Sequence, residues 1–123
     1  PDWRWSPPVV ATLARVALGD DIAAACGADL VVMLIGERPG LSSPDSLGAY
    51  ITFAPQLGVT TDAQRNCVSN IRPEGLPIAD AVRKIVAIAA LARRMKQTGV
   101  TLKEDDALGL LARDEQKIEG PAS

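Results

Sequence analysis

The residues best suited to chemistry in this chain lie where an apolar segment ends. Residues 30–44 read LVVMLIGERPGLSSP, so six consecutive apolar residues run into Glu37 and Arg38 within a turn stiffened by proline and glycine. Such a pair could bind a ligand that carries neutral amides, because the carboxylate accepts N–H hydrogen bonds and the guanidinium donates to carbonyl oxygens. The simpler interpretation is a Glu37–Arg38 contact that only fixes the loop.

The glycines of this turn do not form a phosphate-binding loop. Gly36 and Gly40 lack the third glycine of GxGxxG and the Lys-Ser or Lys-Thr pair of GxxxxGK[ST]. A small stand-alone enzyme that uses a nucleotide is therefore the weakest functional hypothesis for this chain.

A second candidate group is the run Arg65, Asn66 and Cys67, which opens another apolar segment. The sequence contains no histidine, so the usual base that activates a cysteine or serine nucleophile is missing. Only Arg65 is near enough in sequence to lower the pKa of Cys67. A structural role is the simpler interpretation of this cysteine and of Cys26. The residues therefore favour a binding module over a self-sufficient enzyme.

Composition narrows the class of protein further. The chain has 123 residues, enough for one domain, with 47% hydrophobic and 23% charged residues. Its net charge of −2 gives no reason to expect nucleic acid, and its longest apolar run is too short to span a membrane. Two cysteines are too few for a disulfide framework, which favours a reducing cytoplasm.

The elements that must position these residues follow from hydrophobic periodicity and from proline and glycine. We predict helices over residues 9–26 and 77–95 and a weak one over 107–112, with strands over residues 30–35, 49–53, 67–71 and 100–102. This alternation predicts an α/β layered domain with a small, mostly parallel sheet flanked by helices, whose ligands would collect beyond the carboxyl ends of the strands. Tyr50 and Phe53 should point to opposite faces and act in packing.

Three segments resemble the small subunit of ethanolamine ammonia-lyase: ADLVVMLIGERPGLSSPDSLGAYITFAP, DAQRNCVSNIRPEGLP and ARRMKQTGVTLK. The resemblance covers residues 9–103 and is carried mainly by GERPGL and RNCxSNI. Val68 and Ile78 replace the usual Ile and Pro of the family without changing a polar group. The resemblance implies a Rossmann-like cobalamin-binding domain over residues 9–103. It would follow a lead at residues 1–8, expected to be a truncated start, and precede a polar tail at residues 104–123.

The resemblance also implies a function. The family's enzyme converts ethanolamine to acetaldehyde and ammonia with adenosylcobalamin, bound base-on with its dimethylbenzimidazole still on cobalt. Its large subunit, a TIM barrel, holds the catalytic residues, and its small subunit covers the cobalamin. The family's cofactor contacts fall on Val16, Glu37 and Cys67, and no catalytic residue or metal ligand falls on this chain.

Three further expectations accompany this one. Arg38, Arg65 and Asn66 are neighbours that would support the cofactor contacts. The complex would be cytoplasmic, either free or inside a bacterial microcompartment, without nucleic acid or membrane as partners. The competing hypothesis is a structural or regulatory α/β module that has lost its ligand.

Overall fold

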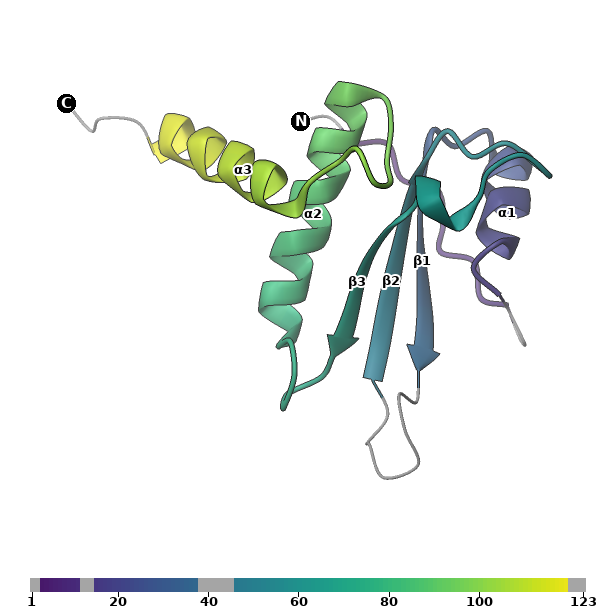
Figure 1. Cartoon of the computed structure of the whole chain (residues 1–123), viewed down its shortest axis with the longest axis horizontal. Helices are drawn as coiled ribbons and strands as arrows, with labels where there is room; N and C mark the ends of the chain where they lie inside the picture. Colours follow the sequence, from purple (N-terminus) through teal and green to yellow (C-terminus); the bar gives the residue numbers. More distant parts are fainter. Residues whose placement is uncertain (1–2, 12–14, 38–45, 120–123) are drawn as a thin grey trace.

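The computed structural model describes residues 3–11, 15–37 and 46–119. Its elements, in chain order, are α1 (Leu18–Cys26), β1 (Leu30–Glu37), β2 (Ser46–Phe53), the short 3₁₀ helix η1 (Asp62–Gln64), β3 (Asn66–Ile71), α2 (Ile78–Met95) and α3 (Glu104–Glu119). The strands form one sheet in the order β1-β2-β3, with α1 beside β1 and α2 beside β3 (Figure 1).

Every pair of neighbouring strands in this sheet is antiparallel. The predicted Rossmann-like, mostly parallel sheet is therefore wrong. Parallel neighbours need a long crossover, usually a helix, whereas antiparallel neighbours can be joined directly. Only residues 38–45 join β1 to β2, and the connection from β2 to β3 contains no helix besides the short η1. The predicted ligand crevice beyond aligned carboxyl ends does not arise, since neighbouring strands point in opposite directions.

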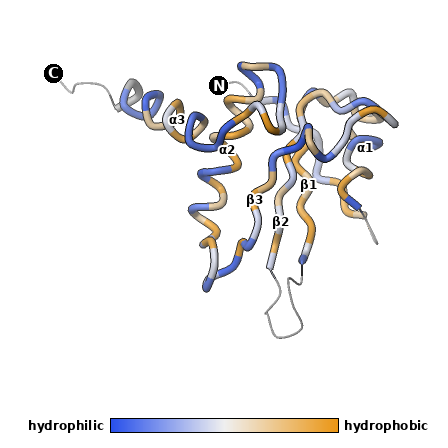
Figure 2. The backbone as a smooth tube through the Cα atoms, in the orientation of Figure 1, coloured by the Kyte–Doolittle hydropathy of each residue, from blue (hydrophilic) through white to orange (hydrophobic). Residues whose placement is uncertain are grey.

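The three main strands and the long helix lie where the sequence predicts them. β1 is hydrophobic along most of its length (Figure 2), and α2 begins directly after Pro77. Residues 100–102, in contrast, are not a strand: they form a turn in which the Leu102 N–H donates to the Gly99 carbonyl over 3.0 Å.

The ends of the chain differ from the prediction in opposite ways. The first helix is shorter than predicted, because residues 9–11 and 15–17 lie outside it and Val10 is almost fully exposed. It ends as expected at Gly27, whose φ of +66° is left-handed. The last helix is longer than predicted and occupies most of the expected polar tail. None of the described helices is long and apolar enough to cross a membrane.

The two faces of the sheet are covered differently. One face packs on α2 and forms the core, with Ile51 of β2 and Ile88 of α2 almost completely buried. The other face meets α1 near Met33: a Cβ added at Gly19 would lie 3.5 Å from the Met33 sulfur, an ordinary contact distance. Two of the predicted site residues, Glu37 and Cys67, lie on this second face.

α3 packs on α2 rather than on the sheet. Ala107 is fully buried in this contact, and two ion pairs flank it, Lys84–Glu104 at 2.7 Å and Arg83–Glu115 at 2.5 Å. Both pairs are substantially exposed, so the apolar contact contributes most of the stability.

Candidate functional site

Glu37 is the last residue of β1 and pairs with Ser46 of β2. Its carboxylate lies over Gly48, so closely that a Cβ added at Gly48 would be 2.6 Å from Oε1 and 3.0 Å from Oε2 of Glu37. The absence of a side chain at Gly48 is therefore what lets the carboxylate rest on the backbone of the neighbouring strand.

Tyr50 is the hydrogen-bond partner of this carboxylate. Its hydroxyl donates to Oε1 of Glu37, and this bond, together with partial burial, raises the pKa of Tyr50 well above its ordinary value. The prediction that Tyr50 and Phe53 point to opposite faces is confirmed, since Phe53 packs against the core. Treating Tyr50 as a packing residue missed its polar role, which depends on strand register.

Cys67 is the second residue of β3 and pairs directly with Tyr50. Partial desolvation raises the pKa of the Cys67 thiol, a hydrogen bond with Tyr50 lowers it, and the charge of Glu37 raises it again. The net shift is upward, so the thiol stays protonated near neutral pH and is a poor nucleophile. Glu37 and Cys67 thus both lie beside Tyr50 on one face of the sheet.

Val16 lies in the turn just before α1 and is half-buried. Its carbonyl accepts the N–H of Gly19 over 3.0 Å, and Gly19 packs on Met33 of the same sheet face. The structure therefore places Val16 beside the part of this face that α1 covers, while Glu37 and Cys67 lie on the part beyond it. Arg38, one of the three neighbours predicted to support these contacts, lies outside the described residues.

Arg65 does not act on Cys67. Its guanidinium forms a bidentate ion pair with Asp20 of α1, with N–O distances of 2.6 Å and 2.9 Å. It also donates to the hydroxyl of Thr52 of β2 over 3.1 Å. The hydrogen bonds to Asp20 contribute most to raising the pKa of Arg65. This buried ion pair holds α1 against the sheet, and it thereby also positions the turn before α1 that contains Val16.

Asn66 has a structural role as well. Its side-chain oxygen accepts the N–H of Gly99 over 2.6 Å, and its amide group donates to the carbonyl of Leu102 over 3.2 Å. Asn66 therefore holds the turn between α2 and α3 against β3. Its contacts lie within the fold.

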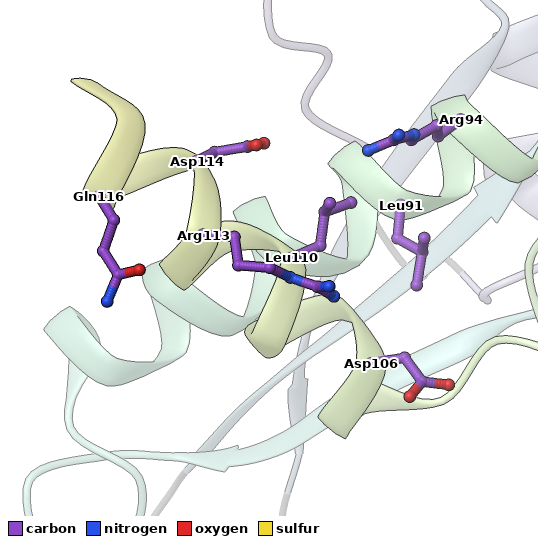
Figure 3. Close-up of a pocket in the computed structure, with 7 residues that line it drawn as sticks. All are labelled: Leu91, Arg94, Asp106, Leu110, Arg113, Asp114 and Gln116. Carbon is purple, nitrogen blue, oxygen red and sulfur yellow. The ribbon is translucent and has the colours of Figure 1, made fainter. Parts of the chain in front are cut away.

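A separate cavity of about 700 Å³ lies between α2 and α3 (Figure 3). It is lined by Leu91, Arg94, Asp106, Leu110, Arg113, Asp114 and Gln116. None of these residues belongs to the sheet, and their charges are mixed. The described residues also contain no group of three or more histidine, cysteine, aspartate or glutamate side chains that could hold a metal ion.

Residues 1–103 match the model of the ethanolamine ammonia-lyase light chain (EutC) family. The chain belongs to this family. It is 61% identical over 104 residues to the ethanolamine ammonia-lyase small subunit of Rhodopseudomonas palustris (strain BisA53), which covers 83% of this chain and 39% of that protein. It is 52% identical over 103 residues to the small subunit of Azotobacter vinelandii, covering 84% and 38%.

A third relative is the small subunit of Ralstonia nicotianae, 50% identical over 109 residues that cover 89% of this chain and 40% of that protein. The chain thus spans about two fifths of the length of these light-chain relatives. The resemblance carried by GERPGL and RNCxSNI is confirmed. The match to the light-chain family ends just before α3 begins.

Proposed function

We propose that this chain is the cobalamin-binding part of an ethanolamine ammonia-lyase small subunit. The assembled enzyme would convert ethanolamine to acetaldehyde and ammonia, with the substrate held by a catalytic large subunit that is a TIM barrel. Family membership supports this assignment. The observation that carries it is that Glu37 and Cys67, thirty residues apart in the sequence, both lie beside Tyr50 on one face of the sheet. Glu37 accepts the hydroxyl hydrogen bond of Tyr50, and Cys67 is the strand partner of Tyr50 on β3.

The residues of this face fit an amide-fringed cofactor such as cobalamin. Oε1 of Glu37 accepts from Tyr50, and no described residue donates to its second oxygen, Oε2. A carboxylate with one oxygen already held by a hydroxyl can accept N–H groups of a ligand at its other oxygen, and the primary amides around a corrin ring offer such groups. Cys67 is exposed and stays protonated, so it offers a polarizable surface without a charge.

Each site residue then has a distinct task. Glu37 accepts an amide N–H, while Val16 and Cys67 provide surface against the ring. Bound adenosylcobalamin supplies radical chemistry. This chain has no histidine that could replace the cofactor's own base, so we expect base-on binding. We expect the complex in the cytoplasm, either free or inside a bacterial microcompartment.

Glu37→Gln tests the assignment. The complete small subunit carrying this domain is assembled with its large subunit and titrated with adenosylcobalamin by visible absorbance. A hydrogen bond to a charged group contributes about 1.5–3 kcal/mol, so the dissociation constant should rise roughly 10- to 150-fold. Asp105→Asn, an exposed change on α3, is the matched control and should leave the affinity unchanged.

Two results would contradict the proposal at different points. Unchanged affinity in the Glu37→Gln enzyme would remove Glu37 from the site. If the unmodified complex neither bound cobalamin nor deaminated ethanolamine, the competing hypothesis of a structural or regulatory module would replace this one.

A further inference from the structure

We infer that Tyr50 is a positioning residue of the cofactor site, whose hydroxyl holds the Glu37 carboxylate so that Oε2 faces the amide groups of the ligand. This inference rests on the proposed function. It assigns a role to a residue outside the three predicted contacts, and it follows from how β1 and β2 are aligned.

Glu37 needs an external support because of where it lies. It is the last residue of β1, and its flexible side chain loses rotamer entropy when it is held in one conformation. Tyr50 pairs with Met33, four positions before Glu37 on the same face, so its ring must extend along the strand to bring the hydroxyl to Oε1. A rigid aromatic ring with a polar tip suits this reach.

Gly48 supplies the second constraint on the carboxylate. It lies two positions before Tyr50 on the same strand and face. A Cβ at Gly48 would lie within 3.0 Å of both carboxylate oxygens, so the Glu37 carboxylate can pack here only against a residue without a side chain. The hydrogen bond from Tyr50 holds Oε1, and the backbone of Gly48 limits how closely the carboxylate approaches β2. Together these two contacts determine the direction of Oε2.

The hydroxyl remains a donor over the whole physiological range. The bond to Glu37 and partial burial raise the pKa of Tyr50, so the phenol stays protonated at neutral and mildly alkaline pH. The bond also lies outside the core. Ile51 of β2 points to the opposite face of the sheet, where it packs in the core with Ile88 of α2, so losing the hydroxyl should leave this packing intact.

The test is Tyr50→Phe in the complete enzyme, with adenosylcobalamin affinity and melting temperature as readouts. We expect the dissociation constant to rise about tenfold with little change in melting temperature. In the Glu37→Gln background the same substitution should have almost no further effect, because the carboxylate that it positions is gone. Thr101→Val, which removes an exposed hydroxyl from the turn before α3, should change neither readout.

Gly48→Ala provides an independent variant that keeps the tyrosine hydroxyl. The added methyl group should displace the carboxylate and weaken cofactor binding to a similar extent. A spectroscopic readout follows from the sequence, which contains a single tyrosine. In this chain the ultraviolet absorbance of tyrosinate should appear only at strongly alkaline pH, and Glu37→Gln should move its appearance to lower pH.

The outcomes separate this inference from the proposed function. An unmodified enzyme that fails to bind cobalamin would overturn both. If Glu37→Gln weakens binding but Tyr50→Phe does not, the positioning role is wrong while the proposed function stands. The positioning role is also wrong if Tyr50→Phe weakens binding equally with and without the Glu37 carboxylate, since Tyr50 would then act by itself.

Discussion

Asp20→Asn should destabilise this chain far more than Asp62→Asn, although both carboxylates contact the same guanidinium. Arg65 and Asp20 have side chains only 5% and 6% exposed and lie 2.6 Å apart. Asp62 contacts Arg65 at 3.1 Å, but its side chain is 95% exposed. The two variants therefore remove the same charge from the same ion-pair network, once inside the protein and once in solvent.

The expected magnitudes follow from burial. Removing one partner of a buried ion pair costs about 3–5 kcal/mol, because the remaining charge keeps its desolvation penalty without its partner. Removing an exposed partner costs about 1 kcal/mol or less. A domain of this size has a total stability of about 5–15 kcal/mol, so Asp20→Asn should consume a large part of it.

Urea unfolding of this chain, followed by far-ultraviolet circular dichroism, measures both free energies of unfolding. The double variant Asp20→Leu with Arg65→Met should recover most of the loss, since it removes both buried charges and replaces them with apolar side chains. Equal losses in Asp20→Asn and Asp62→Asn, or a loss below about 1 kcal/mol in the former, would refute the argument.

Two further predictions concern a glycine and a thiol. Gly99→Ala should cost at least about 2 kcal/mol, because its φ of +105° is strained for alanine and the added Cβ would collide with the Ala63 carbonyl. Gly109→Ala on exposed α3, where a Cβ meets nothing, should instead stabilise by up to about 1 kcal/mol, and thermal melts of the two variants distinguish these effects. Cys67 should react with iodoacetamide more slowly than Cys26 at mildly alkaline pH, because its raised pKa reduces the thiolate fraction. Mass spectrometry of the two labelled peptides measures both rates, and faster labelling of Cys67 would contradict this assignment.

Much of this protein is predictable from local sequence. The apolar run in β1, the helical periodicity of α2 and the glycine at the end of α1 each depend on residues close together in the chain, which is why these elements are predicted correctly. The motifs GERPGL and RNCxSNI identify the family in the same way. Glu37 and Cys67 both stand out in the sequence, and the structure brings both to Tyr50.

Strand direction was decided only by the tertiary structure. A short apolar segment has the same local pattern in a parallel and an antiparallel sheet, so its direction depends on how the connections close. The extent of the terminal helices was decided in the same way. α3 extends as far as Glu119 and packs on α2, whereas Val9 and Val10, predicted to begin the first helix, lie outside α1 and are exposed.

The tertiary structure also decided which residues work together. Tyr50 reaches Glu37 through strand register, and Asp20 finds Arg65 across 45 residues of sequence. No spacing within one element encodes either contact, because each requires two elements to be placed first. Local chemistry determined which side chains were available in this chain. Their pairing arose from the packing of β2 between β1 and β3 and of α1 on the face that they share.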